Sequence, residues 1–275
     1  MELLELLGLA ALGFAVGAYG TTVGLGGGFI LIPILILLYP DYDPEDLTAI
    51  SLAVVWANAT SGAIAYARRL RIDYVTGLLL AAASLPGVIA GVFLVGYLPE
   101  RLFTLLFAVL LLVVAGIALR GPPRGIRQPL SGPGVLRRAQ PAPEGTYRYA
   151  YRVWQAVAIS AGVGLVSSLF GIGGGAFHVP AMIFILHVPV QFAVATSTFI
   201  LIFMSGGATI VHLAQGTLSG DVLLQAVALG AGTIPGAQLG ARIAGVLRPR
   251  HTLALLAVSL AFLSARMLVA ALLDV

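Results

Sequence analysis

The sequence predicts an all-α polytopic membrane protein made of two inverted-topology repeats of about five helical segments each, with helices broken at Gly-rich turns. Composition is the first observation. Only 9% of the 275 residues are charged and mean hydropathy is +1.02, whereas roughly 25% of an average soluble domain is charged. The second is a series of eight to ten apolar stretches of helical length. The third is an internal repeat, because motifs of the first half return in the second.

The first half contains five apolar segments that we expect to be helical: residues 3–19, 29–39, 47–67, 74–95 and 102–119. The chain starts with acidic residues where a signal peptide carries positive charge, so the first segment is expected to stay as a helix. The second has eleven residues, whereas a full membrane span needs about 20. It is therefore a half-helix or the return arm of a re-entrant hairpin. A Ser-Leu-Pro-Gly motif at 84–87 predicts a break within the fourth.

Residues 120–152 separate the two halves and are rich in Pro, Gly and Arg. They show no apolar period, which indicates a solvated connection. This stretch carries seven Arg residues and a single acid, Glu144, so the positive-inside rule predicts that it is cytoplasmic. We therefore expect a first transmembrane repeat over 1–119, a cytoplasmic linker over 120–152 and a second transmembrane repeat over 153–275.

The second half repeats the pattern of the first, with expected helices at residues 153–170, 176–186, 192–213, 222–246 and 253–272. The clearest match is GLGGG at 24–28 with GIGGG at 171–175. Ala-Ile-Ser at 49–51 matches Ala-Thr-Ser at 195–197, and the Pro-Gly motif at 84–87 matches the one at 233–236. An internal repeat with helices interrupted at equivalent positions is typical of transporters and locates their binding site.

Charge predicts the relative orientation of the two repeats. With the linker inside, the basic loop containing Arg68, Arg69 and Arg71 is also inside, and the acidic loop 40–46 is outside. The basic loop of the second half is at 248–251, which is inside only if that repeat is inverted. Both chain ends then lie outside. Each glycine-centred helix pair crosses the membrane twice or not at all, and the short segment 29–39 favours no crossing.

The two triple glycines are the predicted centre of an anion site. Glycine is a poor helix former, so each triplet ends one helix, and the apolar run behind it starts another. A restarted helix leaves its first N–H groups without intrahelical partners and carries partial positive charge there. Within a bilayer these groups need a partner, and an anion is the natural one. The predicted ligand-binding glycines are Gly26, Gly27, Gly28, Gly173, Gly174 and Gly175.

Polar residues at mid-membrane depth complete the predicted substrate site: Ser51, Asn58, Thr60, Ser197 and Ser205. Asn58 is the most costly of them to bury, which favours a role in the site or the pathway. The alternative for each hydroxyl is a bond back to a carbonyl of its own helix.

Histidines have two interpretations in this sequence. His178 follows the second glycine triplet and is added to the predicted substrate site, because it can exchange a proton near neutral pH or meet the anion. The alternative is a packed core residue. His187 and His212 fall near segment ends, where a position at the membrane interface is the simpler expectation.

Catalytic chemistry has no basis in this sequence. There is no Cys, no Walker motif, no pair of intramembrane carboxylates and no His spacing typical of a metal site. We expect no enzymatic activity, no cofactor and no metal. The net charge of +4 comes from Arg residues at helix ends and in the linker, so no nucleic acid is expected. The expected partners are the lipid bilayer and a small anion. A transported proton and a homodimer are left open.

The two Gly-rich breaks, the twofold repeat and the paired Pro-Gly motifs together resemble the sulfite exporter (TauE/SafE) family of membrane permeases. This resemblance covers nearly the whole chain apart from the linker. It implies export of sulfite or an organosulfonate across the inner membrane of a bacterium, whereas the residues themselves support only a small anion. Secondary transport is the leading hypothesis. A passive anion channel is the alternative, and a membrane enzyme or a scaffold is the third.

Overall fold

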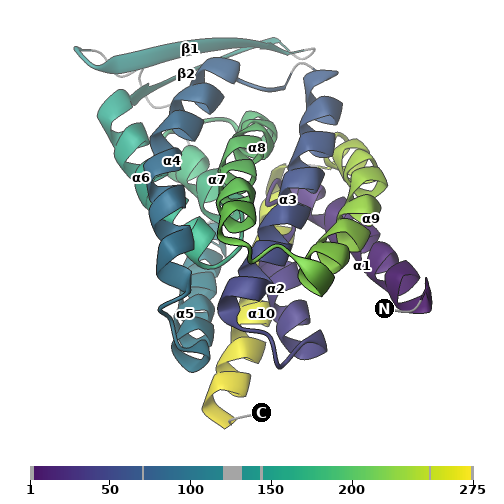
Figure 1. The fold of residues 1–275 in the computed structure, drawn as a ribbon. Helices are drawn as coiled ribbons and strands as arrows, with labels where there is room; N and C mark the ends of the chain where they lie inside the picture. Colours follow the sequence, from purple (N-terminus) through teal and green to yellow (C-terminus); the bar gives the residue numbers. More distant parts are fainter. Residues whose placement is uncertain (1–2, 70, 120–131, 143–144, 248, 274–275) are drawn as a thin grey trace.

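The computed structural model describes residues 3–69, 71–119, 132–142, 145–247 and 249–273, which form ten helices and a β-hairpin (Figure 1). The helices before the hairpin are α1 Leu3–Val23, α2 Gly28–Leu38, α3 Pro44–Ala67, α4 Tyr74–Val95 and α5 Glu100–Leu119. Those after it are α6 Val153–Leu169, α7 Gly175–Phe184, α8 Val190–Gln215, α9 Gly220–Ala244 and α10 Pro249–Leu273. Each predicted segment overlaps one helix, and six of these helices are long and apolar enough to span a membrane.

The equivalent helices α3 and α8 run in opposite directions. At one end the guanidinium of Arg71 donates to Gln191 Oε1 over 2.9 Å, and at the other Thr217 Oγ1 donates to Glu45 Oε1 over 2.7 Å. We call the first end the arginine face and the second the acidic face. Figure 1 shows the hairpin across the arginine face and both chain ends toward the acidic face. The assignment of these faces to inside and outside stays a prediction from charge.

Helices of one half pack against helices of the other in an exchanged pattern. Helix α1 lies along α9, whereas its equivalent α6 lies along α4, which is the equivalent of α9. The last helices of the two halves, α5 and α10, pack against each other. Small residues allow these close approaches, because a side chain at Gly164 would collide with the carbonyl of Ser84, and one at Gly236 with that of Phe14.

The Pro-Gly motifs do not break their helices, so that prediction was wrong. Helices α4 and α9 continue through Pro86 and Pro235. The glycine after each proline instead marks a helix crossing, because a side chain at Gly87 would strike the carbonyl of Ala161 on α6. Close contact with a neighbouring helix therefore explains these motifs better than an interruption does.

Part of the predicted linker is folded, which corrects the expectation of an irregular connection. Strands β1 Val135–Ala142 and β2 Gly145–Arg152 pair in antiparallel register, and β2 leads directly into α6. Tyr149, Ala150 and Tyr151 are buried, whereas Arg148 and Arg152 on either side of them are exposed. The end of β2 that leads into α6 is therefore covered by the rest of the protein. The predicted stretch 120–131 lies outside the described residues.

Candidate functional site

The two glycine breaks have the same backbone conformation, residue by residue. The φ angles of Gly24, Gly26 and Gly27 are 78°, 76° and 90°. The equivalent Gly171, Gly173 and Gly174 have 66°, 82° and 98°. Positive φ strains any residue that carries a Cβ, so this turn requires glycine at three of its positions. At the first break α1 ends at Val23 and α2 starts at Gly28, and at the second α6 ends at Leu169 and α7 starts at Gly175. The sequence predicted an interruption at both places.

The breaks lie against each other at the buried centre of the molecule. A Cβ on Gly28 would stand 2.6 Å from the carbonyl oxygen of Gly171, and a Cβ on Gly175 would stand 2.5 Å from Cα of Leu25. Each restarted helix therefore begins on the opposite break. The side chains of Val55 and Leu201 pack over Gly26 and Gly173 and fill the space beside them.

Side chains of the central helices hydrogen-bond to the carbonyls of the breaks, two of them across the halves and one within the first half. Ser51 Oγ donates to the carbonyl of Gly171 over 2.6 Å, and its equivalent Ser197 donates to Gly24 over 3.2 Å. Asn58 Nδ2 donates to Gly26 over 3.0 Å, and its Oδ1 accepts from Thr21 over 3.1 Å. Three of the five polar residues predicted for the site thus contact a glycine break.

The amides of the breaks are left for another partner. At the two breaks, within the described residues, eight backbone N–H groups donate to no backbone carbonyl: those of Gly26, Gly27, Gly28, Phe29, Gly173, Gly174, Gly175 and Ala176. They stand at the N-termini of α2 and α7, where the helix dipole favours negative charge. Unpaired amides at a helix N-terminus are groups that anions bind in other proteins.

The side chains of three predicted site residues lie apart from the breaks. Thr60 is exposed and bonds back to the carbonyl of Trp56 over 2.8 Å, and Ser205 bonds back to Leu201. In both residues the hydroxyl therefore donates a hydrogen bond to a carbonyl of its own helix, which is the alternative stated for such residues above. His178 is buried, and its Nε2 lies 2.9 Å from Ser160 Oγ. Its side chain therefore packs against α6, although its backbone N–H donates to the carbonyl of Gly174 in the second break over 2.9 Å.

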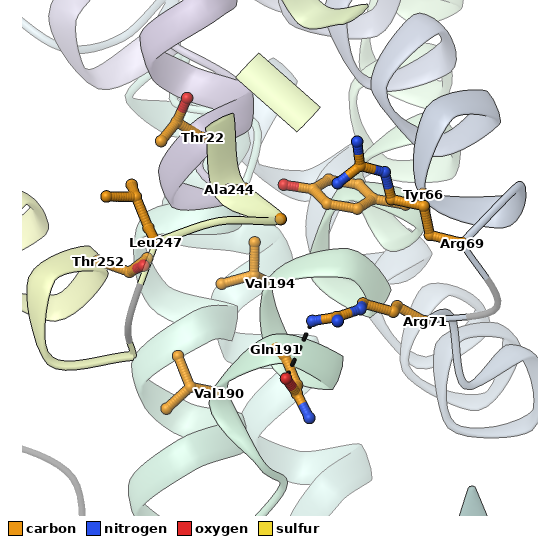
Figure 2. A pocket seen from close by; sticks show the side chains of 11 residues that line it. Thr22, Tyr66, Arg69, Arg71, Val190, Gln191, Val194, Ala244, Leu247 and Thr252 are labelled. Carbon is orange, nitrogen blue, oxygen red and sulfur yellow. Dashed lines mark hydrogen bonds between the residues drawn. The ribbon is translucent and has the colours of Figure 1, made fainter. Parts of the chain in front are cut away.

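A pocket opens on the arginine face directly above the first break (Figure 2). Its polar lining comes from six residues: Thr22, Tyr66, Arg69, Arg71, Gln191 and Thr252. Figure 2 shows Arg69 and Arg71 on one side of this space, with the bond from Arg71 to Gln191 drawn. Val194 forms part of the opposite wall.

The side chain of Val194 separates the pocket from the first glycine break. It lines the pocket, and a Cβ on Gly24 would stand 2.8 Å from Val194 Cγ1. Thr48, 146 residues earlier, occupies the equivalent position over the second break, where a Cβ on Gly171 would stand 3.0 Å from Thr48 Cα. The described residues show a pocket over Val194, and Thr48 is fully buried.

Sequence reasoning missed the role of this pocket. The arginines were used only as orientation signals, and Tyr66, Gln191 and Val194 carried no motif. Arg71 and Gln191 are 120 residues apart, so only the antiparallel pairing of α3 and α8 brings them together. A signal was present in Arg69 and Arg71, because a pair of cations beside a proposed anion path favours anion capture.

A buried ion pair fixes the hairpin to the same face. Asp73 caps α4, and its carboxylate accepts from Arg138 Nη2 over 2.6 Å and from Tyr149 over 2.6 Å. Burial raises the pKa of Asp73, but hydrogen bonds from Arg138, Thr76 and Tyr149 outweigh it and hold the pKa below its ordinary value. Burial and the Asp73 hydrogen bond raise the pKa of Tyr149, so its hydroxyl stays a donor. Asp73 is therefore a charged structural anchor.

Metal binding finds no support in this arrangement, since the described residues contain no group of three His, Cys, Asp or Glu side chains that would hold an ion.

Comparison with known proteins gives a consistent result. A family model described as sulfite exporter TauE/SafE matches residues 9–267. A probable membrane transporter protein YunE of Bacillus subtilis is 31% identical over 242 residues, covering 86% of this chain and 87% of the relative. A probable membrane transporter protein of Haemophilus influenzae is 25% identical over 253 residues, or 89% and 88% of the two chains. The sulfite exporter TauE/SafE family protein 3 of Arabidopsis thaliana is 35% identical over 108 residues, or 36% and 22%. No solved structure is significantly similar.

Proposed function

Because the chain belongs to the sulfite exporter TauE/SafE family, we propose that it is a secondary transporter that exports a small sulfur-containing anion across the inner membrane by alternating access. Sulfite and organosulfonates are the substrate class. The family and the relatives named as membrane transporters support transport as such. The anion, the direction and the mechanism are our proposal.

One observation carries the proposal: unpaired amides at the first glycine break lie one side chain away from an arginine-lined pocket. Arg69 and Arg71 attract an anion into the pocket, where Thr22 and Gln191 offer polar contacts. Val194 then separates it from Gly24 and the amides of Gly26 to Gly28. A tetrahedral or pyramidal oxyanion accepts several N–H bonds at once, which suits a helix N-terminus.

The exchange of equivalent contacts between the halves supports alternating access as the proposed mechanism. In this conformation the pocket lies over Val194, and Thr48 closes the equivalent path on the acidic face. Since each break rests on the other through Gly28 and Gly175, movement of one half relative to the other displaces both breaks together. Opening over Thr48 with closure over Val194 would present the anion to the acidic face.

A passive anion channel is the second candidate, because the same amides would serve a pore. Counterflow separates the two functions. A transporter loaded with unlabelled anion accumulates labelled anion transiently, whereas a channel only equilibrates it. The packing of Val55 and Leu201 against both breaks favours the transporter, since these buried side chains occupy space that an open pore would need there.

The test is sulfite and organosulfonate counterflow in proteoliposomes, with the double variant Arg69→Gln, Arg71→Gln. Removing both charges lowers the local anion concentration at the pocket, so we expect the half-saturating anion concentration to rise about tenfold or more. Arg148→Gln is the matched control, because this residue is exposed on the hairpin and away from the pocket. Unchanged saturation in the double variant would remove the pocket from the anion path, and flux without counterflow would indicate a channel.

A further inference from the structure

His212 is the least satisfied polar side chain on the acidic half of the molecule. It is fully buried in α8, and neither Nδ1 nor Nε2 has a hydrogen-bond partner within the described residues. The sequence places it near the end of a membrane segment, and it does lie in the last turn of α8. An imidazole has at least one donor and one acceptor when neutral, and leaving both unpaired in a buried site is costly. Such a group in a native fold needs a functional explanation.

The carboxylate of Glu45, in the first turn of α3, lies against the C-terminal end of α8, which is the end that carries His212. Asp46 follows Glu45 in the same turn. The Glu45 carboxylate accepts from Thr217 over 2.7 Å and lies beside Gly96, where a Cβ would stand 3.1 Å from Glu45 Oε2. Helices α4 and α6 contain no charged residue, and α7 contributes only His178, which is bonded to Ser160. The acid of α9, Asp221, is exposed in its first turn.

The pseudo-equivalent positions show what is special about this pair. A shift of 146 residues relates Ser51 to Ser197, and the same shift relates Tyr66 to His212 and Glu45 to Gln191. On the arginine face, Tyr66 and Gln191 line the open pocket, and the Tyr66 hydroxyl donates to Thr21 over 2.7 Å. On the acidic face these positions hold a titratable base and an acid. Equivalent positions on the two faces thus differ in their ability to bind a proton.

We propose that His212 is a proton-binding site of the acidic face, which charges when that face opens and pairs with Glu45. A charged imidazolium without partners is strongly disfavoured in the closed, buried environment, so the ring is neutral in this conformation. Opening brings water to the ring, and a proton then forms an ion pair with Glu45 that stabilises the open state. Protonation on this face therefore shifts the conformational equilibrium toward opening. The inference rests on the alternating access of the proposed function.

Distance measurement between spin labels tests this without any transported anion. The chain has no native Cys, so Tyr97→Cys and Gln215→Cys place a label pair on exposed positions of the acidic face. We expect a longer separation at pH 5.5 than at pH 8, because the closed state disfavours the charged ring and only protonation in the open state shifts the equilibrium. His212→Gln, and His212→Tyr as the residue of the equivalent position, should abolish the change. His251→Gln, exposed near the arginine face, is the control.

Glu45→Gln adds a graded readout. Removing the carboxylate weakens proton binding at the ring, so the midpoint should move to lower pH while the size of the change is kept. A full pH response in both His212 variants, or an unmoved midpoint in Glu45→Gln, would overturn the proposal. Loss of anion counterflow in a protein that keeps the pH-dependent distance change would refute the proposed function and leave the proton site standing.

Discussion

At Gly28 and Gly175 the backbone of the opposite break leaves no room for a Cβ atom. Neither has a positive φ, so a side chain is excluded by contact alone, against Gly171 in one case and Leu25 in the other. Gly27 and Gly174 are poorer probes, because their φ angles of 90° and 98° strain every substitution. The contact between the breaks is therefore best tested at the first residue of each restarted helix.

Gly28→Ala is expected to lower stability by about 1–3 kcal/mol, because one added methyl overpacks the contact with Gly171. Transport should fall with it, since the two breaks no longer fit. Gly8→Ala is the control, as nothing lies within 4 Å of its missing Cβ. Thermal unfolding in detergent and counterflow in vesicles measure both effects. Equal behaviour of the two variants would mean that the breaks do not touch.

Asn58→Ala is expected to destabilise by about 1–3 kcal/mol, because the carbonyl of Gly26 and the hydroxyl of Thr21 lose their partner. The break then loses its fixed shape, so anion affinity should fall as well. Thr60→Ala, which removes an exposed hydroxyl bonded to its own helix, should leave affinity unchanged. Anion-dependent thermal shifts of the two variants compare them directly. An Asn58→Ala protein with unchanged affinity would exclude Asn58 from the site.

For single residues, the sequence predicted which polar side chains lie at mid-membrane depth better than it predicted which of them contact the glycine breaks. Ser51, Asn58 and Ser197 were predicted by their depth and do contact the breaks. Thr60 was predicted by the same rule and faces outward. Depth along a helix is visible in hydropathy, whereas the face of the helix depends on which neighbours pack there, and apolar lipid-facing positions blur that signal.

Among the elements, the helices were the predictable part and the hairpin was not. Long apolar segments identify themselves by length, and α4 was predicted with its observed ends, Tyr74 and Val95. The hairpin lies in a stretch rich in Arg and Pro, where its alternating tyrosines were the only signal. Its stability comes from tertiary contacts, such as Tyr147 against Phe192 with ring centroids 5.5 Å apart, that no local pattern contains.

Arg138→Ala is expected to undock the hairpin, because it leaves the buried Asp73 carboxylate without its cation. Breaking such a pair costs about 3–5 kcal/mol. Hydrogen exchange of residues 145–152 should rise strongly, and the exposed Arg148→Ala serves as the control. The double variant Asp73→Asn, Arg138→Gln should recover part of the protection, since a neutral pair replaces an orphaned charge. Full protection in Arg138→Ala would show that the tyrosines alone hold the strands.

The sign of the Asp73 shift predicts how this docking depends on pH. A carboxyl with a lowered folded-state pKa stabilises above its unfolded pKa of about 3.9, and the contribution is lost as pH falls through the folded-state value. Burial raises the pKa of Tyr151 to about 12, so the tyrosines do not titrate near neutrality either. Hairpin protection, corrected for intrinsic exchange, should therefore stay constant from pH 5 to 8. A fall within that window would assign a histidine to the contact.

On the scale of the whole molecule, the two halves give one architecture with two different faces. The repeat was visible in the sequence because glycines must recur wherever the same backbone turn recurs. The asymmetry was not visible, because it lies in pairs such as Tyr66 and His212 that hydropathy does not distinguish. A pocket over Val194 and a buried Thr48 at the equivalent place together predict that access alternates between them.

Single cysteines at these two positions test alternation in a chain that has none of its own. In oriented vesicles without substrate, Val194→Cys should react with a membrane-impermeant thiol reagent added on the arginine face, because it lines the pocket there. Thr48→Cys should stay unreactive from the acidic face in the same state. An imposed anion gradient that favours the other conformation should slow the first reaction and start the second, and Tyr97→Cys, exposed in either case, should not change. Simultaneous reaction at both positions would mean an open pore. Reciprocal change is the outcome that only a transporter with one path and two exclusive openings can produce.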